Sequence, residues 1–183
     1  MKDEIIVRQK PVYTLIYAAG ALAFVLALGY FILAHFGVFY ANYGSLVMLA
    51  VRSKILLVVW IFGFLFFFWA MLYYLRRIFT ALPLLIADEN GITDNSSALA
   101  VGFIPWEDIR KARTKLMGIQ PFILITVKNE EKYLAKLSLL GRMLAKANKK
   151  MGYEIICVNL NTSGANPKSV CDKIENMRKA AKK

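Results

Sequence analysis

Two long apolar runs constrain this chain more than any other feature of its sequence. Residues 12–36 and 55–75 form stretches of 25 and 21 residues without a formal charge. An α-helix rises about 1.5 Å per residue and the hydrocarbon core of a bilayer is about 30 Å thick, so about 20 residues cross it. The sequence therefore predicts two membrane-spanning helices, at about 12–36 and 55–75, in an anchor that occupies residues 1–79.

The charges beside these runs indicate an orientation. Lys10 precedes the first run, and Arg76 and Arg77 follow the second. Positively charged flanks favour the cytosolic side of a membrane. We therefore expect a multi-pass protein with both termini in the cytosol and residues 37–54 on the outer side. The apolar part of this connection, 46–51, either lies along the membrane interface or extends the second helix.

Neither run contains an acidic or basic residue, which argues against a transporter or pump. Such proteins bury ionisable groups near the bilayer midplane. His35, the single histidine of the chain, is interpreted as an interfacial polar residue rather than as a proton or ligand site. The two helices are thus expected to anchor the chain or to pack against the helices of a partner. No GxxxG motif specifies a homodimer, and an oligomer is left open.

Most of the positive charge lies after the second run. The chain has 24 Lys and Arg against 12 Asp and Glu, and residues 75–183 hold 19 of the basic and 10 of the acidic residues. A basic surface near a bilayer favours anionic headgroups, by about 1 kcal/mol per well-placed cation. No RNA-binding motif, helix-turn-helix or zinc pattern accompanies the charge, so no nucleic-acid partner is expected. Cys157 and Cys171 are expected to be reduced thiols.

Residues 80–183 have the pattern of a small α+β domain. Asn90 and Gly91 indicate a tight hairpin, and Asn166 followed by Pro167 indicates the start of a closing helix. The expected strands are 84–87, 92–95, 101–104, 110–116, 122–127, 132–134 and 154–159, and the expected inserted helix is 138–151. An antiparallel β-barrel or curled sheet with an inserted helix and a C-terminal helix is the pleckstrin-homology-like (PH-like) pattern.

Two local stretches carry a resemblance to a known family. GITDNSS at 91–97 and GFIPWEDI at 102–109 make the chain similar to a family of small bacterial membrane proteins that have two N-terminal helices before a PH-like domain. The resemblance covers nearly the whole chain in architecture. It implies a PH-like domain over 80–183 on the cytosolic side of the bacterial inner membrane, and it implies no activity.

The sequence contains no pattern typical of an enzyme, and no catalytic, cofactor-binding or metal-binding residue is predicted. Walker, HExxH and GxSxG motifs are absent. Asp88, Glu89 and Asp94 are interpreted as residues of a solvated turn rather than as a calcium site. Glu107 and Asp108 are interpreted as structural residues, because neighbouring residues of a strand point to opposite faces.

A lipid-contact surface is the one candidate site. The first hairpin loop, 88–91, is acidic, which disfavours binding of inositol lipids there. Cations on and before the inserted helix are better candidates for contact with anionic lipids, and the alternative is a solvated helix face. These candidates are Lys136, Arg142, Lys146, Lys149 and Lys150.

Two functional hypotheses follow. The first is a membrane-anchored PH-like binding or scaffold module that presents a protein-interaction surface at the cytoplasmic face of the inner membrane. The second is an accessory or immunity-type subunit whose transmembrane helices act on a channel, transporter or toxin. The expected partners are the lipid bilayer and a protein.

Overall fold

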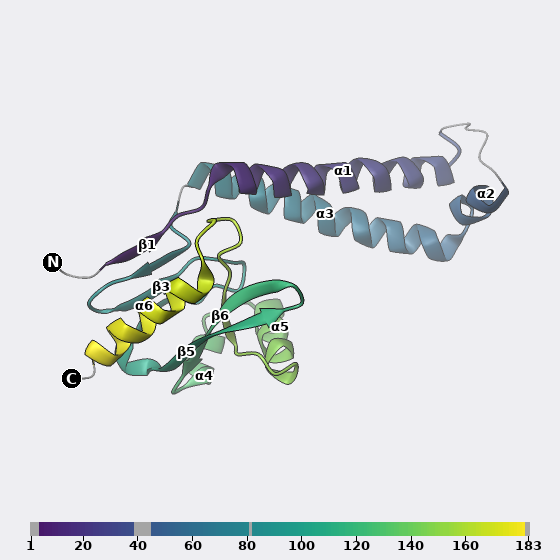
Figure 1. Ribbon diagram of the computed structural model, residues 1–183. Helices are drawn as coiled ribbons and strands as arrows, with labels where there is room; N and C mark the ends of the chain where they lie inside the picture. The colour runs from purple at the N-terminus through teal and green to yellow at the C-terminus, as the bar shows by residue number, and fades with distance from the viewer. Residues whose placement is uncertain (1–3, 39–44, 81, 182–183) are drawn as a thin grey trace. The chain divides into compact units, whose positions relative to one another are not determined.

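The computed structural model describes residues 4–38, 45–80 and 82–181, and it divides into two compact units (Figure 1). One unit is Pro11–Thr80, the helical unit. The other unit, which we call the sheet domain, contains the described residues before and after the helical unit. Expectations that concern residues 39–44 of the outer connection lie outside the described residues.

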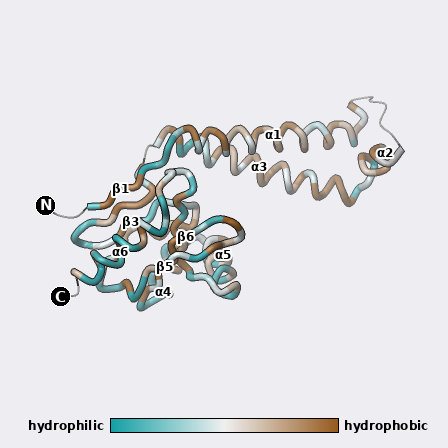
Figure 2. Tube along the Cα trace, in the orientation of Figure 1, coloured by the Kyte–Doolittle hydropathy of each residue, from teal (hydrophilic) through white to brown (hydrophobic). Residues whose placement is uncertain are grey.

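The helical unit consists of α1 (Pro11–His35), α2 (Ser45–Val51) and α3 (Lys54–Thr80). Both apolar runs are helical as predicted, and α3 continues through Arg76 and Arg77. By length and composition α1 and α3 could each cross a membrane, and Figure 2 shows their apolar colouring. The segment at 46–51 belongs to the separate helix α2. Ser53 follows it and caps α3, since its side-chain oxygen accepts a hydrogen bond from the Leu56 N–H at 3.4 Å.

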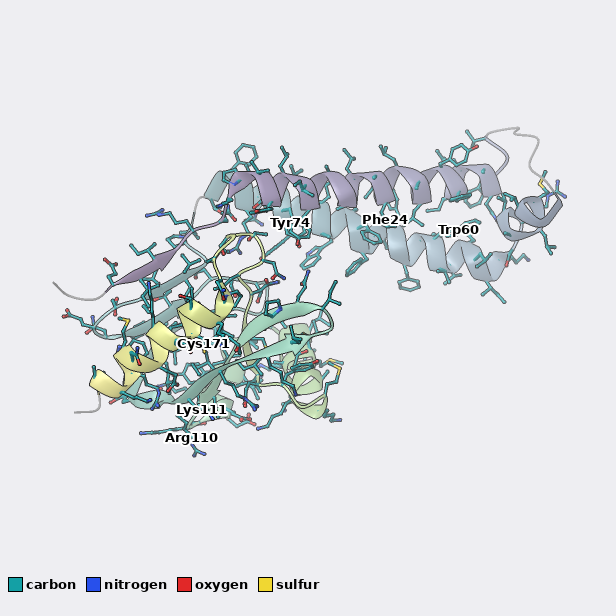
Figure 3. The ribbon with its side chains drawn as sticks, viewed as in Figure 1. Phe24, Trp60, Tyr74, Arg110, Lys111 and Cys171 are labelled. Atoms are coloured by element: carbon teal, nitrogen blue, oxygen red, sulfur yellow. The ribbon has the colours of Figure 1, made fainter. Side chains whose placement is uncertain are left out.

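Three stacked aromatic pairs connect α1 to α3, and Figure 3 labels one member of each. The ring centroids are 5.4 Å apart in the Tyr17–Tyr74 pair, 4.3 Å in Phe24–Phe67 and 5.3 Å in Phe31–Trp60. On each helix the members are seven residues apart, which is two helical turns and returns the side chain to the same face. We call these pairs the aromatic ladder.

Small residues allow α1 and α3 to approach each other beside the aromatic ladder. Ala18, Ala21 and Val25 are buried on α1. A Cβ on Gly63 of α3 would lie 3.1 Å from the Leu28 side chain. Small residues at this kind of spacing are typical of closely packed membrane helices. Gly29 and Gly63 therefore serve contact within the hairpin.

The sheet domain contains two antiparallel sheets. The first has the order β1-β2-β3-β4, with β1 (Ile5–Val7), β2 (Leu85–Ala87), β3 (Gly91–Asp94) and β4 (Gly102–Pro105). The second has the order β5-β6-β7, with β5 (Ile109–Met117), β6 (Gln120–Val127) and β7 (Ile156–Val158). Among the described strands neither sheet closes into a barrel.

The strand β1 precedes the first apolar helix, yet it belongs to the sheet domain. Ile5, Ile6 and Val7 pair with Ala87, Ile86 and Leu85 of β2. Val7 is buried, and its carbonyl accepts a hydrogen bond from the Leu84 N–H at 2.8 Å. The segments on both sides of the helical unit therefore meet in one sheet, a pairing that the sequence analysis did not predict.

One apolar core lies between the two sheets and α6 (Pro167–Ala180). Ile92 and Ile104 of the first sheet, Ile125 of the second and Ile174 of α6 are all fully buried. The predicted cap of α6 is confirmed, because the Asn166 side chain accepts hydrogen bonds from two N–H groups of the first helical turn. The helix α6 contacts β5 and β6 and thereby covers one side of the second sheet (Figure 1).

Two local predictions were wrong. Residues 132–134 are not a strand but lie in the helix α4 (Glu130–Leu134), because Asn129 caps it and two glutamates occupy its first turn. Glu107 and Asp108 do not lie on a strand but in the short 3₁₀ helix η1 (Trp106–Asp108), which follows Pro105. Trp106, the first residue of η1, is buried, since only 4% of it is exposed.

Candidate functional site

The candidate lipid-contact residues lie on α5 (Leu139–Lys150) and on the turn between α4 and α5. The predicted inserted helix is confirmed in α5. Ser138 caps its start, since its Oγ accepts a hydrogen bond from the Gly141 N–H at 3.2 Å. Gly152, with φ of 81°, ends it. A left-handed residue after a helix is a common stop signal, and glycine adopts it without strain.

Two of the five candidate cations donate hydrogen bonds to backbone carbonyls of the domain. Lys136 Nζ donates to the carbonyl oxygens of Phe103 at 3.0 Å and Val101 at 3.4 Å, which lie at the edge of the first sheet. Arg142 donates to the carbonyls of Leu137 and Ala135 in the turn before α5. Both side chains therefore satisfy backbone acceptors, and a change at either one would also disturb the fold.

The other three cations lie on the second half of α5. Lys149 forms an ion pair with Glu130 of α4. Lys146 and Lys150 are exposed. The helix has no acidic residue. Of the predicted set, Lys146 and Lys150 are thus the best placed to meet an external anion.

The apolar side of α5 is exposed rather than packed on the core. The helix contacts the domain through the small buried residues Gly141 and Ala145, and a Cβ on Gly141 would lie 3.6 Å from the Leu99 side chain. Leu139 is 78% exposed and Leu140 is 64% exposed. The sequence predicted a helix here but not that its apolar side faces outward. A helical projection of α5, which places all its large apolar residues on one side, could have indicated it.

Asp108 is the centre of a polar cluster beside α4. Its Oδ2 accepts hydrogen bonds from Lys132 Nζ at 2.7 Å and from the Tyr133 hydroxyl at 2.5 Å. These two hydrogen bonds lower the pKa of the Asp108 carboxyl, the Lys132 bond most. Burial, together with the hydrogen bond to Asp108, raises the pKa of Tyr133. The cluster therefore holds a carboxylate and a neutral phenol, and it fixes α4 to η1.

Hydrogen bonds from backbone N–H groups to acidic side chains stabilise the acidic hairpin turn. Asp88 Oδ1 accepts hydrogen bonds from the N–H groups of Asn90 at 2.8 Å and Gly91 at 3.1 Å. Asp94 is buried and its carboxylate accepts from the Ser96 N–H at 2.9 Å. Among the described residues, no group of three His, Cys, Asp or Glu side chains could hold a metal ion. The carboxylates of Asp88 and Asp94 thus serve as turn acceptors.

An open hollow of about 460 Å³ lies beside this turn, between it and the end of α6. Trp106 contributes to its wall, and the indole N–H of Trp106 donates to the Asp88 carbonyl oxygen at 2.8 Å. We call it the α6 groove. Its lining residues are Asp88, Glu89, Trp106, Asn176, Met177, Ala180 and Ala181.

The remaining predicted residues lie near the helix ends. Arg77 of α3 donates to the Tyr73 hydroxyl at 3.0 Å, and Arg76 is exposed. The Lys10 backbone N–H donates to the Thr162 carbonyl at 2.7 Å. His35 Nδ1 lies 2.6 Å from the Val51 carbonyl oxygen, so this side chain connects the end of α1 to the end of α2. An interfacial structural role agrees with this contact.

Cys157 and Cys171 are both free, as predicted. Burial raises the pKa of each thiol to about 11. Since the thiolate is the reactive form, both cysteines are poor nucleophiles at neutral pH.

No protein-family model matches the chain, and no curated protein or solved structure is significantly similar to it.

Proposed function

We propose that this chain is a membrane-anchored binding module, in which the helical unit spans a bilayer as a hairpin and the PH-like sheet domain presents a protein-interaction surface at the cytoplasmic face of a bacterial inner membrane. The observation that carries the proposal is the pairing of β1 with β2. It joins the residues just before the helical hairpin to those just after it.

The helical unit supports the anchor. A long apolar helix in a soluble protein is normally buried, whereas no residue of α3 is buried. Large apolar side chains such as Phe62, Leu65 and Phe66 are exposed along it. Arg76 and Arg77 stand near its C-terminal end beside Trp69 and Tyr73, the residue types that occupy the boundary between hydrocarbon and water.

The strand β1 supports the orientation. Ile6 and Ile86 can pair only on one side of a bilayer, because a three-residue strand cannot reach across it. The segments before α1 and after α3 would therefore share one compartment, and the basic charge of the sheet domain favours the cytosol.

The order of elements supports a PH-like domain. A four-stranded and a three-stranded antiparallel sheet enclose one core, and a C-terminal helix lies against the second sheet. The α6 groove is the candidate protein-interaction surface. It combines apolar walls from Trp106 and Met177 with the acidic side chains of Asp88 and Glu89, which favour a partner segment that is apolar and basic.

Purification of partners from native membranes in mild detergent tests the function. We expect a protein that is retained by the full chain and lost with Ala180→Arg, which fills the α6 groove. The matched control is Lys179→Ala, an exposed change on the same helix. Exchange of residues 11–80 for an unrelated helical hairpin should keep the partner. If only this exchange removes it, recognition lies in the membrane helices and the module proposal is wrong.

Labelling of introduced cysteines tests the orientation. Glu4→Cys and Lys173→Cys should react with a membrane-impermeant maleimide from one side of sealed vesicles, and Arg52→Cys from the other. The native thiols, whose pKa values are about 11, should react slowly at pH 7. Reaction of Glu4→Cys and Arg52→Cys from the same side would overturn the hairpin arrangement.

A further inference from the structure

The exposed side of α5 forms a continuous apolar stripe. At about 100° per residue, its large apolar residues and one alanine fall within an arc of roughly 140°. The stripe residues are Leu139, Leu140, Met143, Leu144, Ala147 and Met151. Each of them is exposed, although leucine and methionine are residues that domains of this size usually bury. This α5 stripe therefore lacks a cover within the sheet domain.

The turn between β5 and β6 extends the exposed apolar surface. Ile119 in this turn is 94% exposed, and Leu116 near the end of β5 is 60% exposed. The turn lies near the C-terminal end of α5, because Lys115 Nζ donates to the Gly152 carbonyl at 2.8 Å and sits over the Tyr153 ring. The C-terminal end of α5 and the end of the β5–β6 hairpin thus lie close together.

Cations border this apolar surface. Lys146 and Lys150 lie at one edge of the α5 stripe in the helical projection and are exposed. The helix has four basic residues and no acidic one. A leucine- and methionine-rich stripe bordered by lysines is the composition of helices that lie in the headgroup layer of anionic bilayers. A protein partner of similar apolarity would not by itself require this excess of positive charge.

We propose that the α5 stripe and the β5–β6 turn insert into the headgroup layer of an anionic bilayer, with Lys146 and Lys150 contacting lipid phosphates. This inference rests on the proposed membrane anchor. Tethering by α1 and α3 keeps a bilayer surface at a high effective concentration, so a weak interfacial contact is sufficient. The sheet domain is then held against the membrane as well as attached to it.

Fluorescence quenching by labelled lipids in proteoliposomes tests the inference on the full chain. An environment-sensitive thiol dye is attached to Leu140→Cys, with Lys173→Cys on α6 as the matched exposed control. In vesicles of mixed phosphatidylglycerol and phosphatidylcholine, a lipid with a nitroxide near its headgroup should quench the dye at position 140 and leave that at position 173 bright. In pure phosphatidylcholine, the loss of fluorescence at position 140 should be smaller.

Two further variants separate the possible outcomes. A dye on Leu26→Cys in α1 should be quenched by a nitroxide deep in the acyl chain, and failure there would contradict the anchor itself. With the anchor intact, absence of quenching at position 140 would overturn the present inference. The same holds if the dye at position 140 is shielded equally in detergent, because a second copy or another protein would then cover the α5 stripe. Lys146→Glu with Lys150→Glu should reduce quenching in anionic vesicles.

Discussion

Phe24 and Phe67 stack with their ring centroids 4.3 Å apart and their planes 9° from parallel, at the middle pair of the aromatic ladder. The pairs on either side keep the same antiparallel register. In a lipid environment apolar burial does not drive helices together, so close contact between such rings contributes to association. The aromatic ladder thereby sets which residues of α1 and α3 face each other.

Removal of the middle rings should weaken the hairpin. We expect the Phe24→Ala and Phe67→Ala changes to be coupled by about 1 kcal/mol in a double-mutant cycle, since each ring stabilises the hairpin through the other. Dissociation in dodecyl sulfate, followed by energy transfer between dyes on the two helices, measures the coupling. Phe62→Ala, which removes an exposed ring from α3, is the control. Additive effects of Phe24 and Phe67 would contradict the pairing.

Truncation of Val7 should destabilise the sheet domain. Val7 is 7% exposed and packs with the core, so Val7→Ala should cost about 2 kcal/mol. Ile6→Ala on the same strand should cost about 0.5 kcal/mol, because Ile6 is 44% exposed. Urea unfolding of the full chain in detergent, followed by Trp106 fluorescence after Trp60→Phe and Trp69→Phe, measures both. Equal small effects would show that β1 contributes little to the fold.

Gly91 should not tolerate a side chain. A Cβ at this position would lie 2.2 Å from the Ile104 carbonyl oxygen and 2.8 Å from Pro105 Cα. Since both are backbone atoms, Gly91→Ala should lower stability by about 3 kcal/mol in the same urea assay. Gly118→Asn is the control, because φ there is 63°, asparagine tolerates this conformation, and no atom lies within 4 Å. A mild effect at position 91 would contradict the close approach.

The Glu175 carboxylate should make the stability of the domain sensitive to acid. Burial opposes its ionisation, but hydrogen bonds from Arg178 and from the Ala112 N–H outweigh burial and lower the pKa of Glu175 below its ordinary value of 4.5. A carboxyl whose folded-state pKa is lowered stabilises the fold above its unfolded-state pKa. That stabilisation is lost as the pH falls through the folded-state value.

Glu175→Gln isolates this contribution. At pH 7 the variant should be less stable than the natural chain by about 1 kcal/mol, and the difference should shrink as the pH falls below 4.5. Urea unfolding at a series of pH values measures it. Asp172→Asn, an exposed change on the same helix, should leave the pH profile unaltered. A constant difference between pH 3 and pH 7 would exclude an ionised Glu175 as the cause.

Elements with a strong local pattern were predictable from the sequence. The apolar runs, the cap formed by Asn166, and the buried strand at 122–127 each depend on nearby residues, and the structure confirms them. The stretch 132–134 was wrongly predicted to be a strand, because the prediction did not include Asn129 as a helix cap. The aromatic ladder was also missed, although the seven-residue spacing of Tyr17, Phe24 and Phe31 is visible in the sequence.

Contacts between distant segments could not be predicted in the same way. Nothing near Ile6 indicates that its partner lies beyond two apolar helices. The hydrogen bond from Lys136 to the Phe103 carbonyl at the edge of the first sheet likewise depends on the path of the turn before α5. The sequence does not specify that path. For the candidate site, the sequence indicated the cations of α5. The exposure of the apolar side of α5 depends instead on the packing of this helix against the domain through Gly141 and Ala145.

The pairing of β1 with β2 also determines when the first sheet can form during synthesis. The strand β1 leaves the ribosome before its partner Leu85–Ala87, which emerges only after both apolar helices have been made. The buried side chain of Val7 therefore cannot pack into the core until both apolar helices and β2 have been made. A chain that ends before residue 85 would therefore keep β1 without its partner strand.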